Sequence, residues 1–196
     1  LVGTQMVAKG LDFPGVTLVG VIAADTALNL PEMTAGERTF QLLTQVAGRA
    51  GRATAGQVII QTYQPEQDAI QTAAQQDYLT FYEKEIQRRE AFFYPPFSTI
   101  IRLVVSGLKE NNVSDAAQDI VGYFGKYKKD QDWLVGPAPA PYSKVKDRYR
   151  YQLMLRGKDL TELRQLVCRG LAEARQQCRW AKDIQILVDV EPGSMM

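Results

Sequence analysis

The sequence has 196 residues, with 23 Lys and Arg, 22 Asp and Glu, and no histidine. This length is enough for one large domain or two small ones with a real hydrophobic core. The charge is uneven along the chain, since residues 1–96 hold seven Lys and Arg against ten Asp and Glu, and residues 97–196 hold sixteen against twelve. The basic second half is consistent with a polyanionic partner.

The two cysteines, Cys168 and Cys178, cannot form a Cys/His zinc site within this chain, because it has no histidine. For the same reason neither thiol is a candidate nucleophile, and both are expected to pack in a helix stripe. No apolar run reaches membrane-spanning length and no signal peptide is visible, so a cytoplasmic setting without membrane contact is expected. The first residue is not methionine, which indicates a piece of a longer chain.

The first part of the chain alternates strand and helix signals. Residues 16–25 are almost continuously apolar and β-branched, which predicts a strand buried on both faces. Residues 37–47 have a helical apolar pattern, and residues 57–63 predict another strand. Strand, helix and strand in this order are typical of an α/β nucleotide-handling lobe.

Two arginines three residues apart, Arg49 and Arg52, follow the predicted helix in the stretch QVAGRAGR of residues 45–52. A guanidinium is always charged, and its planar fork of donors suits phosphate oxygens. The glycines beside it let the backbone approach a ligand closely or end a helix. The stretch predicts a phosphate-binding element, although by itself it also fits an ordinary helix C-terminus.

Two segments resemble conserved motifs of superfamily 2 helicases. The sequence GTQMVAKG of residues 3–10, followed by Asp12, Phe13 and Pro14, is similar to their fifth motif, and residues 45–52 are similar to their sixth. The spacing, with a strand and a helix between, matches their second RecA-like lobe. The wording of both motifs is similar to the primosomal protein N′ (PriA) family of replication-restart helicases.

This resemblance implies a catalytic role for three residues of the sixth motif. Arg52 would be an arginine finger on the γ-phosphate of ATP, Arg49 would lie beside it on the phosphates, and Gln45 would couple this site to the DNA groove. An arginine supplied across an interface contributes about 10³–10⁵ in rate in related NTPases. ATP and Mg²⁺ would be bound mainly by another lobe, because this chain has no G-x-x-x-x-G-K-S/T loop and no acidic magnesium motif. The chain alone is therefore predicted to be inactive, and its longer parent to be an ATP-dependent 3′-to-5′ DNA helicase.

The fifth motif carries the other implied site residues. Thr4 would contact the nucleic-acid backbone, and Gly10 and Asp12 would shape the link from that contact to the bound nucleotide. The resemblance also implies Zn²⁺ in the upstream part of the parent, where the family has a cysteine cluster. No metal site is expected in this chain.

Residues 65–96 predict a polar helical connector that ends at Tyr94-Pro95-Pro96-Phe97, because a Pro-Pro pair cannot continue a helix. PriA-like proteins have a similar Pro-Pro-aromatic signature where their C-terminal domain begins. The predicted domains are therefore the C-terminal part of a RecA-like lobe at 1–64, the connector at 65–96, and a DNA- or partner-binding α/β domain at 97–196.

The C-terminal domain has the pattern of a βαββαβ fold. Alternating apolar residues predict strands at 101–105, 133–136, 149–155 and 184–190. Two helices are predicted between them, one capped by Ser114 and one opened by Asp159. This order favours an open-faced α/β sandwich with both helices on one side, and the family resemblance points the same way.

A basic segment follows a stiff, proline-rich loop at residues 136–141. Tyr149 and Tyr151 share the alternation of the core leucines, so we expect both to pack. The outward-facing cations would suit the phosphates of DNA, and they are Lys144, Lys146, Arg148 and Arg150. The alternative is a solvated hairpin with no ligand.

The resemblance implies a function at stalled replication forks and several partners. These are branched or single-stranded DNA, single-strand-binding protein and other primosome proteins. The acidic-hydrophobic tail of single-strand-binding protein would need an arginine beside an apolar groove, for which Arg164 and Arg169 are candidates. Two alternatives stay open, namely another superfamily 2 translocase, or a nucleic-acid or protein docking module without catalytic function.

Overall fold

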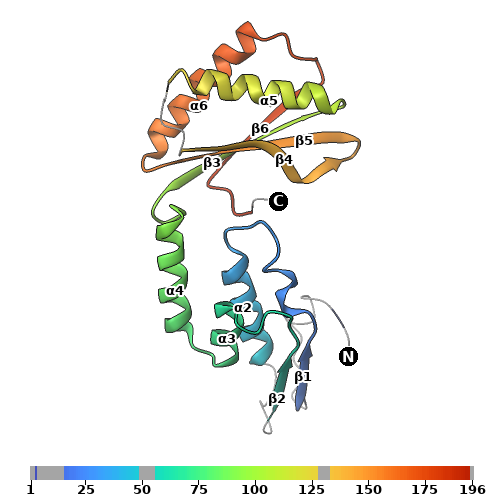
Figure 1. Ribbon diagram of the computed structural model, residues 1–196, viewed down its shortest axis with the longest axis vertical. Helices are drawn as coiled ribbons and strands as arrows, with labels where there is room; N and C mark the ends of the chain where they lie inside the picture. The colour runs from blue at the N-terminus through green and yellow to red at the C-terminus, as the bar shows by residue number, and fades with distance from the viewer. Residues whose placement is uncertain (1–2, 4–15, 49–55, 128–132, 195–196) are drawn as a thin grey trace. The chain divides into compact units, whose positions relative to one another are not determined.

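The computed structural model describes residues 3, 16–48, 56–127 and 133–194. The chain divides into two compact units, Leu1–Arg88 and Arg89–Met196 (Figure 1). Each unit has a hydrophobic core of its own. The division between the units falls inside the segment predicted as a connector. The functional assignment of the three predicted domains stays a prediction.

The first unit is built on a pair of parallel strands, and a helix lies between them in the sequence. Strand β1 (Leu18–Val21) pairs with β2 (Gln57–Ile60) in parallel, so that Leu18 lies opposite Gln57. Parallel neighbours need a crossover connection, and the segment that contains α2 (Ala35–Ala47) provides it. The predicted helix and second strand are therefore confirmed, with slightly different ends.

The prediction of a first strand buried on both faces is wrong. Only four residues are in β1, Leu18 is 59% exposed, and the neighbouring Ile22 is 83% exposed. A continuous apolar run is typical of a strand with neighbours on both sides and helices on both faces. The described sheet of this unit has two strands and is not a complete RecA-like lobe, so much of the apolar run remains in contact with solvent.

The connector contains two helices where one was predicted. Helix α3 (Asp68–Ala74) is separated from α4 (Tyr78–Ala91) by a turn in which Gln76 has φ 54°. The Asp77 carboxylate accepts the Thr80 amide at 3.0 Å and the Thr80 hydroxyl at 2.6 Å, and these bonds fix the start of α4.

A small core holds these helices against α2. The rings of Phe40 and Phe81 stack with centroids 4.3 Å apart and planes 8° apart. Leu43, Ile70 and Ala73 are buried around them.

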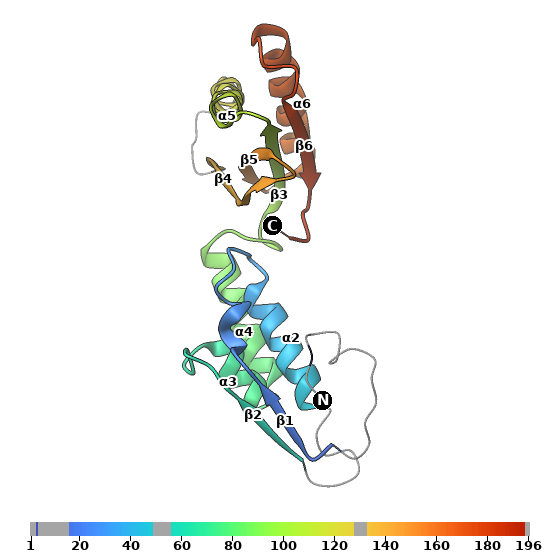
Figure 2. The same cartoon turned by 90° about the vertical axis from the view of Figure 1, so that its right-hand side faces the viewer.

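The second unit has the predicted βαββαβ order. Its elements are β3 (Thr99–Gly107), α5 (Glu110–Phe124), β4 (Leu134–Val145), β5 (Arg148–Gly157), α6 (Leu160–Gln177) and β6 (Gln185–Val190). The sheet order is β4-β5-β3-β6 and every neighbouring pair is antiparallel. Both helices lie on the same side of the sheet (Figures 1 and 2), which is the ferredoxin-like arrangement and confirms the predicted open-faced sandwich.

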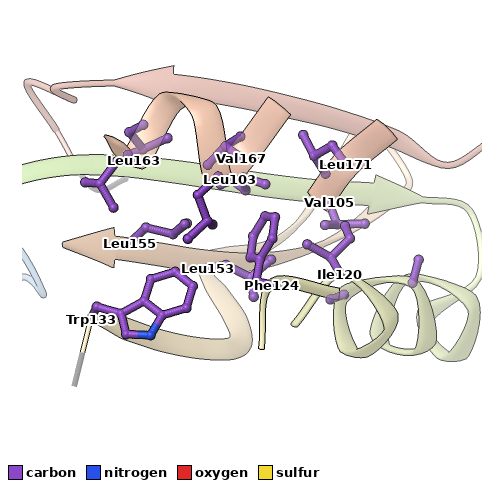
Figure 3. Close-up of a cluster of buried hydrophobic side chains, with 14 of the residues drawn as sticks. Leu103, Val105, Ile120, Phe124, Trp133, Leu153, Leu155, Leu163, Val167 and Leu171 are labelled. Atoms are coloured by element: carbon purple, nitrogen blue, oxygen red, sulfur yellow. The ribbon is translucent and has the colours of Figure 1, made fainter. Parts of the chain in front are cut away.

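The core of this unit lies between the sheet and its two helices. Odd-numbered residues of β3 and β5 face the helices, because side chains alternate along a strand. Figure 3 shows the resulting cluster, which includes Leu103, Val105, Leu153 and Leu155 from the sheet, Ile120 and Phe124 from α5, and Leu163, Val167 and Leu171 from α6. Tyr149 and Tyr151 pack against this cluster as predicted.

The proline-rich segment is a strand, which corrects the prediction of a loop. It belongs to β4, and the pairing with β5 has irregularities between Val135 and Ala138 and between Pro139 and Lys144. Proline cannot donate a backbone hydrogen bond and is tolerated on edge strands and at bulges. Strand β4 is an edge strand of the sheet, so its outer side does not need these donors.

The two helix starts of this unit were predicted with different success. Asp159 is the N-cap of α6, and its carboxylate accepts the Thr161 amide at 2.7 Å. The proposed cap Ser114 is wrong, since α5 begins at Glu110 and Ser114 lies inside it. The chain turns in two residues after β3, and Glu110 occupies the first turn, where an acidic side chain favours the helix dipole.

The prediction that both cysteines are core residues is wrong for Cys168. Cys168 is exposed, and Cys178 is half-buried at the C-cap of α6. The buried stripe of α6 runs through Val167, and the next residue along a helix is rotated by about 100° away from it. None of the helices in the described ranges is long and apolar enough to cross a membrane.

Candidate nucleic-acid interface

The four predicted DNA contacts lie in one β-hairpin. Strands β4 and β5 are joined by Lys146 and Asp147, with φ of 48° and 60°. Positive φ at both central residues is typical of the type I′ turn, whose twist matches that of the two strands. Val145 pairs with Arg148 directly beside the turn.

The two lysines of the hairpin are exposed. Lys144 Nζ lies 5.0 Å from the centroid of the Tyr149 ring and 3.6 Å from Asp147 Oδ1. Both contacts are in solvent, where an ion pair contributes little to stability. Lys146 lies at the tip of the turn. These two ammonium groups can therefore reach a phosphate without breaking a buried interaction.

Arg148 lies on the outward face as predicted from its even position, but it differs from the exposed lysines because its guanidinium is bonded to main-chain carbonyls. Its side chain is half-buried, and Nη2 donates to the carbonyl of Ser106 at 3.2 Å and to the carbonyl of Asp183. The reason is its position at the start of β5, beside the end of β3, where main-chain carbonyls accept the guanidinium. Its role toward DNA stays a prediction.

Arg150 lies on the sheet face opposite the helices, where the structure brings it together with Arg102 and Arg156, which the sequence pattern did not single out as DNA contacts. Arg102 Nη2 forms an ion pair with Asp189 Oδ2 at 3.0 Å. Arg156 Nη1 donates to the Phe92 carbonyl at 2.9 Å, and its guanidinium lies 5.7 Å from the Tyr94 ring centroid. The alternation along 148–156 contained this signal, since Arg148, Arg150 and Arg156 are all at even positions.

Most of the predicted helicase residues lie outside the described residues. Gln45 is described, and it is exposed near the end of α2. Gly48 follows as the C-cap and donates its amide to the Thr44 carbonyl at 3.0 Å. The helix therefore ends just before the arginine pair. The predicted site residues that lie outside the described ranges are Thr4, Gly10, Asp12, Arg49 and Arg52.

Asp25, which the sequence left without a role, is a structural residue. Its carboxylate accepts the Thr62 hydroxyl at 2.6 Å and the Tyr63 amide at 3.0 Å. The bond from Thr62, followed by the one from Tyr63, lowers the pKa of Asp25 below its ordinary value. Within the described part of the chain, no group of three or more His, Cys, Asp or Glu side chains could hold a metal ion.

Comparison with known proteins decides the family. The sequence model of the family described as "Primosomal protein N C-terminal domain" matches residues 90–193. The chain belongs to this family. The match includes every described helix and strand of the ferredoxin-like unit, and it confirms the PriA resemblance that the motifs of the first unit indicated.

Curated relatives named "Replication restart protein PriA" extend the PriA similarity to the first unit. The Bacillus subtilis (strain 168) protein is 42% identical over 197 residues, covering 100% of this chain and 24% of the relative. The Synechocystis protein is 39% identical over 196 residues, covering 100% of this chain and 23% of the relative. The Treponema pallidum protein is 36% identical over 197 residues, covering 100% of this chain and 29% of the relative. The chain thus spans about a quarter of the length of these PriA proteins.

Proposed function

We propose that this chain is the C-terminal part of an ATP-dependent 3′-to-5′ DNA helicase that recognises stalled replication forks and restarts replication through primosome assembly. The observation that carries the proposal is the similarity to PriA proteins across both units, including the two helicase-like motifs in the first. The helicase activity belongs to the longer parent, because this chain has no G-x-x-x-x-G-K-S/T loop.

The first unit supports a place in a RecA-like lobe. Its parallel strands with a helix in the crossover form the repeating element of α/β nucleotide-binding domains. Arg52 and Arg49 directly follow the C-cap of α2 in the sequence, so a helix end would position them for phosphate contacts.

ATP with Mg²⁺, bound mainly by the other lobe, would supply the free energy for translocation. The donor set of this chain fits such a ligand, since two guanidiniums suit phosphate oxygens. Arg52 would act as the arginine finger, Arg49 would hold the phosphates beside it, and Gln45 would couple them to the DNA groove. Gly10 and Asp12 would link this site to Thr4 on the DNA backbone. Zinc would belong to the upstream part of the parent.

The second unit would bind DNA through its hairpin and a protein partner through α6. Lys144 and Lys146 are exposed at the tip and can neutralise phosphates. A shallow hollow on α6 is lined by Thr161, Arg164, Gln165 and Cys168. This arginine beside apolar side-chain stems would suit the acidic-hydrophobic tail of single-strand-binding protein, which favours Arg164 over Arg169.

Binding of forked DNA by the 196-residue chain tests this function. We expect the double variant Lys144→Glu with Lys146→Glu to bind forked DNA more weakly. The slope of log K against log salt concentration should fall in magnitude by about 1.8, since each lost phosphate contact removes about 0.9. Arg169→Glu with Arg175→Glu, both on the exposed side of α6, is the charge-matched control. Equal losses in both pairs, or no binding by the unaltered chain, would argue against the proposed DNA contact.

A further inference from the structure

We propose that the sheet face opposite the helices binds the backbone of single-stranded DNA along β5, with Arg150 and Arg156 as the phosphate contacts. This inference rests on the proposed function and specifies where the second unit meets its DNA. It adds Arg156 to the contacts and moves the path of the strand from the hairpin tip onto the sheet.

Positive charge collects on this face. Side chains alternate along antiparallel strands, so the residues of β3, β5 and β6 that oppose the core share one surface. Four of these residues are arginines and one is acidic, namely Arg102, Arg148, Arg150, Arg156 and Asp189. Arg102 pairs with Asp189, which leaves the β5 arginines without a carboxylate on the face itself.

Among the described residues, no carboxylate on this face compensates the charge of the three β5 arginines, Arg148, Arg150 and Arg156. Arg148 and Arg156 donate to main-chain carbonyls, which are neutral. The Nε atom of each is buried without a hydrogen-bond partner among the described residues. Arg150 has no hydrogen-bond or ion-pair partner in the described ranges. A half-buried cation in this state gains from an approaching anion, because the local dielectric is lower than that of water.

Acidic side chains near the two ends of the face are already bonded. At the Arg148 end, the Asp183 carboxylate accepts the Leu108 amide at 2.6 Å. At the Arg156 end, Glu191 Oε1 accepts the Ile100 amide at 3.1 Å and also the Thr99 hydroxyl. These carboxylates are therefore oriented by the backbone of β3 and its extension.

The shape of the charged row favours a single strand over a duplex. Arg148 and Arg156 are eight residues apart on one strand, which corresponds to about 26 Å. The row follows one β-strand, and a single DNA strand can lie along it for several nucleotides, whereas the two backbones of a duplex wind away from it. Between the arginines lie Gln152 and Met154, which offer an amide for base edges and a polarisable thioether for base faces. Lys146 at the hairpin tip extends the row at its Arg148 end.

The test compares binding of a fluorescent oligo-dT and a blunt duplex of equal length by the 196-residue chain. The variant is Arg150→Gln with Arg156→Gln, and the matched control is Arg169→Gln with Arg175→Gln on α6. Each lost single-strand contact should lower the slope of log K against log salt concentration by about 0.7. The double variant should therefore lose about 1.4 from this slope and bind oligo-dT roughly 25-fold more weakly at 0.1 M salt. We expect a smaller loss for the duplex.

Two single variants separate a loss of DNA contacts from a loss of folding. Arg150→Gln alone removes no described contact, so its effect on binding is independent of folding, and Arg156→Lys keeps the charge at the second site. Oligo-dT dissociation constants within twofold of the control, for both Arg150→Gln and the double variant, would overturn the inference. If the lysine variants lose fork binding while these arginine variants do not, the proposed function stands and this inference falls.

Discussion

Phe124 of α5 occupies the space that a side chain at Gly170 of α6 would fill. A Cβ atom built on Gly170 would lie 2.4 Å from Cδ1 of Phe124 and 2.6 Å from its Cε1. Phe124 is fully buried and belongs to the core between the two helices and the sheet. The close approach of α5 and α6 therefore depends on the absence of a side chain at one position.

We predict that Gly170→Ala destabilises the chain, because overpacking against Phe124 costs about 1–3 kcal/mol. The greater helical preference of alanine offsets about 0.5–1 kcal/mol of this cost. Urea unfolding measures the change. Gly122→Ala is the matched control, because Gly122 is also helical and its built Cβ meets nothing within 4 Å. The control should be neutral or slightly stabilising. If Phe124→Leu fails to relieve part of the Gly170→Ala loss, steric conflict with the ring is not the cause.

A second prediction concerns the start of α6. Asp159→Ala removes an N-cap whose carboxylate accepts the amides of Thr161 and Glu162. The cost should be about 0.5–2 kcal/mol in urea unfolding, since a helix start loses its side-chain acceptor. Asp159→Asn should retain most of the stability because the amide oxygen can still cap. A loss of the same size in both variants would point to charge rather than capping.

The pH dependence of the first unit provides a third prediction. The hydrogen bonds from Thr62 and Tyr63 hold the pKa of Asp25 below its ordinary value of 3.8. A depressed folded-state pKa stabilises the fold fully above 3.8, and this contribution disappears as the pH falls through the lower folded value. Asp25→Asn should therefore lower the melting temperature at pH 7 and have a smaller effect near pH 3. If Asp25→Asn lowers the melting temperature by the same amount at pH 7 and near pH 3, ionised Asp25 is not the source of the stabilisation.

The two thiols should react at different rates. Burial, followed by the hydrogen bond with Asp119, raises the pKa of the Cys178 thiol, whereas Cys168 is exposed on α6. Because the thiolate is the reactive form, iodoacetamide should modify Cys168 before Cys178 in the folded chain. Peptide mass spectrometry over time measures both rates. In urea the two rates should become similar, and a difference that persists there would have a local sequence cause.

Arg52→Ala tests the proposed arginine finger in the longer parent helicase. The turnover number for ATP should fall by about 10³–10⁵, because the transition-state charge loses a donor, while ATP binding should change little. Lys84→Ala removes an exposed cation of the first unit and should leave turnover unchanged. An equal loss of binding and turnover would assign Arg52 to the structure of the site.

Alternation of side chains made much of the second unit predictable. Leu103 and Val105 are two residues apart in one strand, as are Leu153 and Leu155 in another, and this period alone separates the core face from the other face. The resulting strand and helix order, together with the rule that both helices cover one side, was enough to predict the sandwich.

Other features depend on neighbours that a local pattern does not contain. The apolar run around Leu18 predicts burial only if other strands flank it, and the described sheet has two strands. The prolines of β4 indicate a loop unless the segment is known to be an edge strand. Arg148 is half-buried because the carbonyls of Ser106 in β3 and of Asp183 before β6 accept its guanidinium, and these partners are 42 and 35 residues away in the sequence.

The prolines of β4 have a consequence for how this protein avoids self-association. Pro137, Pro139 and Pro141 lie within this edge strand, and none of them has a backbone N–H group to donate. A strand from another molecule needs a regular series of donors and acceptors to extend a sheet, and the prolines together with the irregular pairing of β4 interrupt that series. The edge of the sheet at β4 is therefore protected against β-aggregation by missing donors rather than by charge, so this protection should not depend on salt or pH.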